Sequence, residues 1–228
     1  EWVPGTPAVG LLTNRDNHCV IPFADGTVLV SPGQPGSVPN NFWGVFKARV
    51  WAALGGTPQM PPGGTGDPVG LLQNPAVAVI GNDGWVFGGD DGNPSNKLYR
   101  ITKTATGFTI KGWVNPWAPP FPGAVKLRYV SNSGFAYEGA MWVYAGGWQP
   151  DDNSAGQLGK TLYKINVSNR DAPIMLAVSV NNLPNGQRVE GQYSVATIDA
   201  ANKRMICISY DGVLVNTYDF VSGKWASI

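Results

Sequence analysis

The stretch AVAVIGNDGWVFGG, residues 76–89, decides the fold class of this chain. Two apolar runs rich in valine and aromatic residues flank Asn82-Asp83-Gly84, a triplet typical of a tight β-hairpin turn. The same style returns in RMICISYDGVLVNTYDFVSGKW, residues 204–225, where we expect Ser222-Gly223 to turn the last hairpin. Helical periodicity is nearly absent along the chain, so these hairpins predict an all-β fold.

The hairpins recur at long intervals, which indicates a repeat architecture. VGLLTN at 9–14 returns as VGLLQN at 69–74, and DGTVLV at 25–30 is answered by DGWVFG at 83–88. We expect one domain over 1–228, a β-propeller that begins with an N-terminal segment at 1–17. Its four units of four antiparallel strands are predicted near 18–55, 74–114, 125–180 and 193–228.

A family resemblance supports the same architecture. In the second unit a hydrophobic strand ends in Gly88-Gly89, Leu98-Tyr99 opens the next strand, and Trp113 closes the unit. This pattern resembles the kelch repeat. The third unit repeats it with Gly146-Gly147 and Leu162-Tyr163 but without the tryptophan.

The first and last units carry the pattern in weaker form. Tyr218 and Trp225 fit the last unit, where Tyr210-Asp211-Gly212 replaces the paired glycines. The first unit has Pro32-Gly33 followed by Phe42-Trp43. The resemblance implies four kelch-like blades, and it implies no single function, because kelch-like propellers serve as enzymes, adaptors and lectin-like binders.

Composition excludes several classes of function. Sixteen basic against 15 acidic residues give a net charge of +1, so the chain lacks the basic footprint of a nucleic-acid binder. His18 is the only histidine, which rules out a histidine-rich zinc site. As a catalytic pair, His18 and Cys19 fail, because adjacent strand residues point to opposite faces. The apolar runs are too short for a membrane span, and we expect no membrane insertion.

The two cysteines allow one structural expectation. Cys19 and Cys207 fall in the first and last units, which would be neighbours in a closed ring. A disulfide could then lock the ring, but we expect two buried free thiols.

The connections of a propeller are predicted to divide between two faces. The short-turn face would carry turns such as Ala24-Asp25-Gly26, Thr104–Gly107 and Ser222-Gly223. The long-loop face would carry the loops after the second strands and the crossings between blades. Those loops are 32–41, 90–97 and 148–161, and the crossings are 55–70, 115–123 and 181–192. Long loops on a rigid scaffold are where binding residues concentrate, so we expect the binding site there.

Aromatic and hydrogen-bonding residues gather in these segments. The predicted ligand-binding residues are Trp148, Trp117, Phe121, Asp90, Asp91, Asn93, Gln149, Asp151, Asp152 and Arg188. Aromatic faces can stack on sugar rings while the polar neighbours bond to hydroxyl groups. The same mixture suits a protein partner, because tryptophan, tyrosine and arginine dominate interface hot spots.

The acidic loop residues leave other readings open. Asp90-Asp91 and Asp151-Asp152 could cap their own turns or could hold Ca²⁺, which takes 6–8 oxygen ligands, although no cofactor is required. The same carboxylates could serve a carbohydrate hydrolase. Glu138 and Glu190 are not expected to converge, because one lies in a short turn and the other in a blade crossing.

We therefore expect a non-catalytic recognition domain that binds a glycan or a protein receptor through the long-loop face. Charged residues are only 14% of the chain, and the chain begins at Glu1 with no leader in view. Both features favour a mature or excised domain at an extracellular or virion surface, such as receptor binding on a phage tail. The alternatives are a propeller that cements a homo-oligomer or larger assembly, and the hydrolase.

Overall fold

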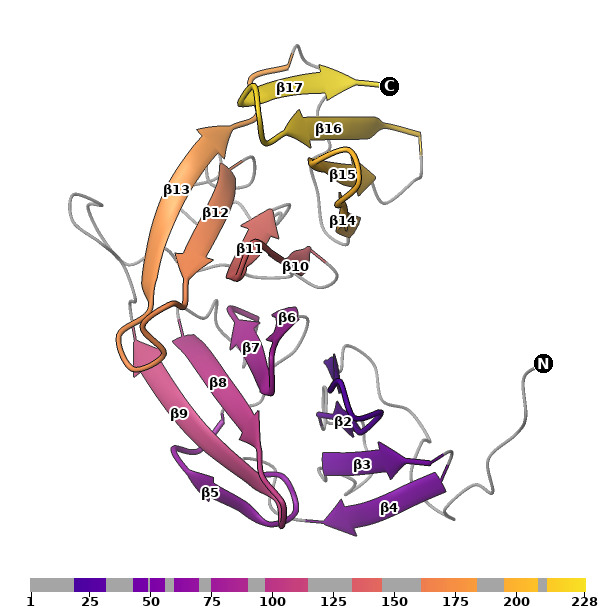
Figure 1. The fold of residues 1–228 in the computed structure, drawn as a ribbon, viewed down its shortest axis with the longest axis vertical. Coiled ribbons are helices and arrows are strands. Elements are labelled where there is room, and N and C mark those ends of the chain that lie inside the picture. The colour runs from indigo at the N-terminus through magenta and orange to yellow at the C-terminus, as the bar shows by residue number, and fades with distance from the viewer. Residues whose placement is uncertain are drawn as a thin grey trace.

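A computed structural model defines the fold. It describes residues 19–31, 43–48, 50–55, 60–69, 75–89, 97–114, 133–144, 161–183, 195–208 and 213–228. Within these residues all regular structure is β and no helix occurs. The strands form four small antiparallel sheets arranged as a four-bladed β-propeller (Figure 1), which confirms the predicted fold class.

Each blade runs from an innermost first strand to an outermost fourth strand. Blade 1 contains β1 (Val20–Pro22), β2 (Val28–Val30), β3 (Trp43–Lys47) and β4 (Val50–Gly55). Blade 2 contains β6 (Ala76–Ile80), β7 (Asp83–Phe87), β8 (Lys97–Lys103) and β9 (Phe108–Val114). Blade 3 contains β10 (Gly134–Tyr137), β11 (Ala140–Tyr144), β12 (Thr161–Asn166) and β13 (Ile174–Val180). Blade 4 contains β14 (Val195–Asp199), β15 (Arg204–Ile208), β16 (Val215–Asp219) and β17 (Lys224–Ser227).

Blade 2 departs from the predicted four strands. A fifth strand, β5 (Gly64–Gly66), pairs in parallel with the outer edge of β9. Asp67 fixes this edge, since its amide donates to the Ile110 carbonyl (3.0 Å) and its carboxylate accepts from the Gly112 amide (2.8 Å). The Gly-Thr-Gly sequence of β5 has no apolar alternation, so the pattern that predicts the other strands does not reveal it.

The hairpin that decides the fold is present, with its turn shifted from the predicted position. Ile80 pairs with Asp83, so the loop is Gly81-Asn82, and Asp83-Gly84 belong to β7. Gly81 adopts a φ of 62°, a left-handed value that favours glycine. Gly84 serves packing instead, because a Cβ at this position would collide with the Ile21 side chain of blade 1.

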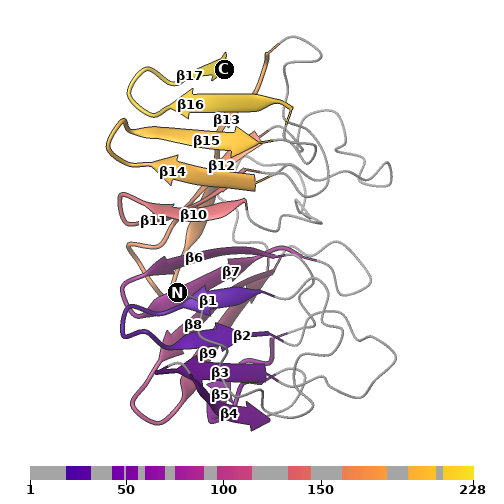
Figure 2. The same cartoon turned by 90° about the vertical axis from the view of Figure 1, so that its right-hand side faces the viewer.

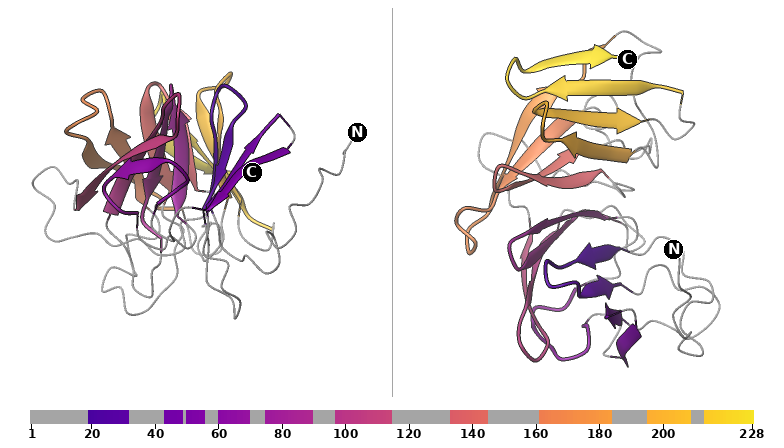
Figure 3. Two further views of the ribbon diagram at one scale, coloured as in Figure 1. Left: turned by 90° about the horizontal axis from the view of Figure 1, so that it is seen from below. Right: turned by 45° about the vertical axis from the view of Figure 1, so that its right-hand side comes forward.

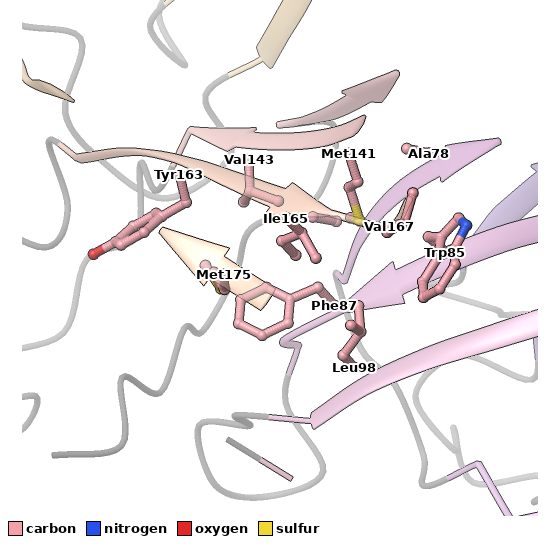
Figure 4. Packing of buried hydrophobic residues seen from close by; sticks show 11 residues of the cluster. Ala78, Trp85, Phe87, Leu98, Met141, Val143, Tyr163, Ile165, Val167 and Met175 are labelled. Atoms are coloured by element: carbon pink, nitrogen blue, oxygen red, sulfur yellow. The ribbon is translucent and has the colours of Figure 1, made fainter. Parts of the chain in front are cut away.

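Three hydrophobic clusters hold the blades together, one at each junction between consecutive blades. The cluster of blades 1 and 2 centres on Ile21, Leu29, Trp43, Tyr99 and Ile101. The cluster of blades 2 and 3 (Figure 4) includes Ala78, Trp85, Phe87, Leu98, Met141, Val143, Tyr163, Ile165 and Met175. The cluster of blades 3 and 4 includes Phe135, Trp142, Tyr144, Leu162, Met205, Cys207 and Tyr218. Each blade thus has two faces. The preceding face is the one on the side of the blade before it in the chain, and the following face is the one on the side of the next blade; blades 1 and 4 have the equivalent two faces.

The third-strand tyrosines occupy equivalent positions, but the closing tryptophans do not. Tyr99, Tyr163 and Tyr218 all point to the preceding blade. Trp113 lies opposite Leu98 and packs in the cluster toward the following blade. Trp225 lies opposite Tyr218 and packs toward the preceding blade. The tryptophans that carry the kelch resemblance are therefore not structurally equivalent.

The blades follow one another along an arc, and blades 1 and 4 lie at its two ends (Figures 1 and 3). No hydrophobic cluster of the described residues joins blade 1 to blade 4. Cys19 and Cys207 belong to different clusters, and both are buried free thiols, as expected.

Candidate functional site

The two faces of the propeller differ as the sequence predicts, with one exception. The crossing 55–70, predicted on the long-loop face, reaches the short-turn face, where the Gly63 carbonyl accepts from the Phe108 amide (3.3 Å) beside the β8–β9 turn. The short turns, including those between β1 and β2, β8 and β9, and β16 and β17, lie together on one face (Figure 2, left side). The second strands end and the third strands begin on the opposite face, as β7 and β8 do. This is the long-loop face, where the predicted binding segments are attached.

Every predicted ligand-binding residue falls outside the residues that the structure describes. They are Trp148, Trp117, Phe121, Asp90, Asp91, Asn93, Gln149, Asp151, Asp152 and Arg188. The same holds for the proposed calcium sites at Asp90/Asp91 and Asp151/Asp152, and for His18 and Glu190. What the structure does describe is the scaffold from which these segments leave.

On the long-loop face, the strand ends of blade 3 are fixed by buried polar contacts. Tyr144 ends β11, and its hydroxyl accepts a hydrogen bond from Asn181 Nδ2 (3.2 Å). Asn181 also accepts from the Leu183 amide (3.1 Å). These bonds tie the end of the second strand to the chain that leaves the fourth strand, so the segments attached there start from fixed points.

Tyr163 marks the edge of the core on the same face. Its ring belongs to the cluster of blades 2 and 3, and its hydroxyl points away from the other side chains of that cluster (Figure 4). Burial raises the pKa of Tyr163 well above its ordinary value, so the phenol stays protonated at neutral pH.

Blade 1 has a comparable closure at its loop end. Ser31 follows β2, and its hydroxyl accepts from the Cys19 amide (2.8 Å) while its own amide donates to the Cys19 carbonyl (3.0 Å). Burial raises the pKa of Cys19 to about 11 and that of Cys207 to about 12. Neither thiol is a nucleophile at neutral pH, because the reactive form is the thiolate.

A cluster of polar and aromatic side chains lies between blades 2 and 3. Trp85 and Trp113 stack with ring centroids 5.9 Å apart, and the Arg100 guanidinium lies 6.0 and 5.7 Å from their centroids. Arg100 also donates to the Arg170 carbonyl (2.6 Å) and to the Asp171 carboxylate (3.3 Å). The Trp113 indole N–H donates to the Asp171 carbonyl (3.3 Å).

This cluster is a joint between blades, because its groups bind one another. Asp83 is buried in blade 2, where its carboxylate accepts from Thr102 Oγ1 (2.6 Å) and from Arg170 Nη2 (2.6 Å) of blade 3. Sequence analysis missed Arg100, Arg170 and Asp171, and placed Asp83 only in a turn. One weak sequence pattern points to the bases of these joints. The third strand of each of the first three blades ends in a basic residue or is followed by one within a few residues, at Lys47, Lys103 and Arg170.

Blades 1 and 2 share a simpler joint of the same kind. The Asp25 carboxylate, in the first turn of blade 1, lies 2.8 Å from Lys103 Nζ at the end of β8. A hydrogen bond from Lys103 and another from the Thr27 amide hold the pKa of Asp25 well below its usual range. The short-turn face therefore carries charged contacts that lock consecutive blades together.

Aromatic rings replace charges between blades 3 and 4. Phe220 packs against Tyr137 (centroids 4.7 Å apart) and Trp142 (4.8 Å). Trp225 packs against Tyr144 (5.3 Å), and its indole N–H donates to Ser179 Oγ (3.0 Å). Glu138, in the turn between β10 and β11, is exposed on the short-turn face.

The described residues contain no group of three or more His, Cys, Asp or Glu side chains that could hold a metal ion. The part of the chain that the structure describes also contains no helix with the length and apolar character of a membrane span. Comparison with protein-family models and with curated proteins found no match to this sequence. The kelch resemblance therefore rests on the residues quoted above, and the propeller fold rests on the structure.

Proposed function

We propose that this chain is a non-catalytic recognition domain that binds a glycan through the long-loop face of its propeller. The observation that carries the proposal is the division between the two faces. On the short-turn face, the charged groups Asp25, Asp83, Lys103 and Arg170 are engaged in joints between blades. The segments attached to the opposite face contain Trp117 and Trp148, and two of these segments carry asparagine and aspartate beside paired glycines.

The chemistry of those segments supports a sugar ligand. Trp117 and Trp148 offer flat apolar surfaces for the C–H faces of a sugar ring, and Asn93, Gln149 and Arg188 offer hydrogen-bond partners for hydroxyl groups. Because only 14% of the residues in the chain are charged, neutral polar groups of this kind would supply much of the specificity. A role at an extracellular or virion surface, such as a phage tail, would place the domain where glycans are presented.

A glycan array probed with the labelled chain tests the proposal. We expect a restricted set of glycans to bind, and Trp148→Ala or Trp117→Ala to weaken binding by about 5- to 30-fold, since one stacked aromatic ring contributes on the order of 1–2 kcal/mol. Val221→Ala is the matched control, because Val221 is 76% exposed in the turn between β16 and β17 on the short-turn face.

Binding that is unchanged in both tryptophan variants would remove these residues from the site. Failure of every glycan, together with tryptophan-dependent capture of a host-surface protein, would replace the glycan with a protein receptor. Turnover of a bound glycan would favour the hydrolase alternative.

A further inference from the structure

The following face of blade 4 is an apolar sheet surface at one end of the arc. Val195 pairs with Ile208, and Ile208 pairs with Val215, so the three side chains form a row across β14, β15 and β16. Ile206 lies on the same face, two residues before Ile208. Val195 is 42% exposed and Ile208 is 37% exposed. Strand residues of this kind usually cover a core.

In the other three blades the equivalent positions are buried against the next blade. They are Ile21 and Leu29 in blade 1, Trp85 and Phe87 in blade 2, and Phe135, Trp142 and Tyr144 in blade 3. Blade 4 repeats the apolar pattern of this face, but no blade of the described residues lies against it. The pattern indicates an interface between blades whose second half is not supplied by blades 1–4 of the same copy.

Blade 1 presents the complementary kind of surface at the other end of the arc. Its preceding face carries Val20, Pro22 and Val28, and Pro22 pairs with Val28 across β1 and β2. Val20 is 44% exposed. In blades 3 and 4 the corresponding face is buried, as at Val143 and Met205.

Charged joints connect blade 1 to blade 2 and blade 2 to blade 3. In both, an acid at the first hairpin of one blade meets a base at or after the end of the third strand of the next, as in Asp25–Lys103 (2.8 Å) and Asp83–Arg170 (2.6 Å). At the two ends of the arc, Asp199 ends β14 and accepts from Arg204 Nε (2.9 Å) of its own blade, and Lys47 Nζ lies 3.9 Å from Asp25 of its own blade. Both charges are thus paired within one copy, and the two ends match in their apolar surfaces.

We propose that the following face of blade 4 packs against the preceding face of blade 1 of a second copy of this chain. The contact continues the blade-to-blade packing that occurs three times within one copy. Because the two surfaces differ, the association is head to tail. This inference goes beyond the proposed glycan recognition and does not depend on it.

Sedimentation velocity and light scattering at micromolar concentrations test the proposal. We expect the wild-type chain to sediment with the mass of two or more chains. Ile208→Glu, on the blade 4 face, and Val20→Glu, on the blade 1 face, should each reduce this to the mass of one chain. Leu176→Glu is the matched control, because Leu176 is equally exposed (43%) on β13 of blade 3, and this variant should associate like the wild type.

Mixing the two variants separates a head-to-tail contact from any other. The Ile208→Glu chain keeps an intact blade 1 face, and the Val20→Glu chain keeps an intact blade 4 face. An equimolar mixture should therefore form a two-chain complex that neither variant forms alone, which also shows that both variants are folded. A wild-type chain that stays monomeric, association that survives both substitutions, or a mixture that stays monomeric would overturn the proposal.

Discussion

Single side chains decide how closely the blades of this propeller approach one another. Asp83 is buried, and its carboxylate accepts hydrogen bonds from Thr102 of its own blade and from Arg170 of blade 3. Gly84, the next residue, leaves room for Ile21 of the neighbouring blade. Asp83 thus attaches blade 2 to blade 3, and Gly84 allows blade 2 to approach blade 1 closely.

The two buried thiols should react slowly with alkylating reagents, because burial raises the pKa of both. At pH 8, a pKa of about 11 leaves Cys19 with roughly a hundredfold less thiolate than an ordinary cysteine pKa of 9.0 would, and Cys207 has less still. We expect neither cysteine to be alkylated by iodoacetamide in the native chain at pH 8, and both to be alkylated in denaturant. Mass spectrometry measures the outcome, and rapid modification of either native cysteine would contradict the burial described above.

At the scale of elements, the turn between β12 and β13 is held by blade 2 through Arg170. Arg170→Ala leaves the buried Asp83 carboxylate with Thr102 as its remaining side-chain partner in these contacts. We expect the free energy of unfolding to fall by about 1–3 kcal/mol, the usual cost of depriving a buried polar group of a partner. Urea denaturation measures the change.

Lys47→Ala is the control for that prediction. Lys47 and Asp25 are 3.9 Å apart and both are substantially exposed, so this ion pair should contribute less than about 1 kcal/mol. Equal losses from Arg170→Ala and Lys47→Ala would contradict the structural role assigned to the joint.

The sequence predicts the elements that depend on local patterns and misses those that depend on contacts between residues far apart in the chain. Alternation and turn residues predict β6 and β7, although Gly81, and not Gly84, supplies the left-handed turn residue. The β5 strand escapes prediction because its pairing with β9 depends on backbone bonds and Asp67. The Asp83–Arg170 contact joins residues 87 positions apart, and no single-sequence pattern pairs them.

For the candidate site, the sequence predicts which face should bind, and the structure describes that face only up to the strand ends. The asymmetry between short turns and long connections follows from turn chemistry, which is local. The orientation of Trp113 and Trp225 does not, because a shift in cross-strand register sends similar residues to opposite faces of their blades. Residue type alone could not reveal that difference.

The free energy of unfolding of the whole molecule should be nearly constant around neutral pH and should fall both in acid and in alkali. The pKa of Asp25 is lowered by Lys103 and Thr27, and that of Asp219 by the Ser222 amide and hydroxyl. The folded chain therefore binds fewer protons than the unfolded chain in acid, and stability falls as pH drops below about 4. The raised thiol pKa values have the opposite sign, so stability also falls as pH rises above about 9.

Urea midpoints measured from pH 2 to pH 11 test this profile. We expect a plateau between about pH 5 and pH 8 and losses on both sides. A midpoint that kept rising below pH 4 would contradict the role of the carboxylates. One that kept rising above pH 9 would contradict the burial of the thiols.

The central claim is that consecutive four-stranded sheets pack face to face as propeller blades, and one engineered disulfide tests it most directly. A Cβ at Gly84 would lie 3.6 Å from the Ile21 Cβ, within the range that a disulfide spans. In the double variant Ile21→Cys/Gly84→Cys, the shorter side chain at position 21 also removes the atoms that would collide. Peptide mass spectrometry after mild oxidation should find residues 21 and 84 linked across blades 1 and 2. Two reduced thiols that are readily alkylated in the native double variant would contradict this packing.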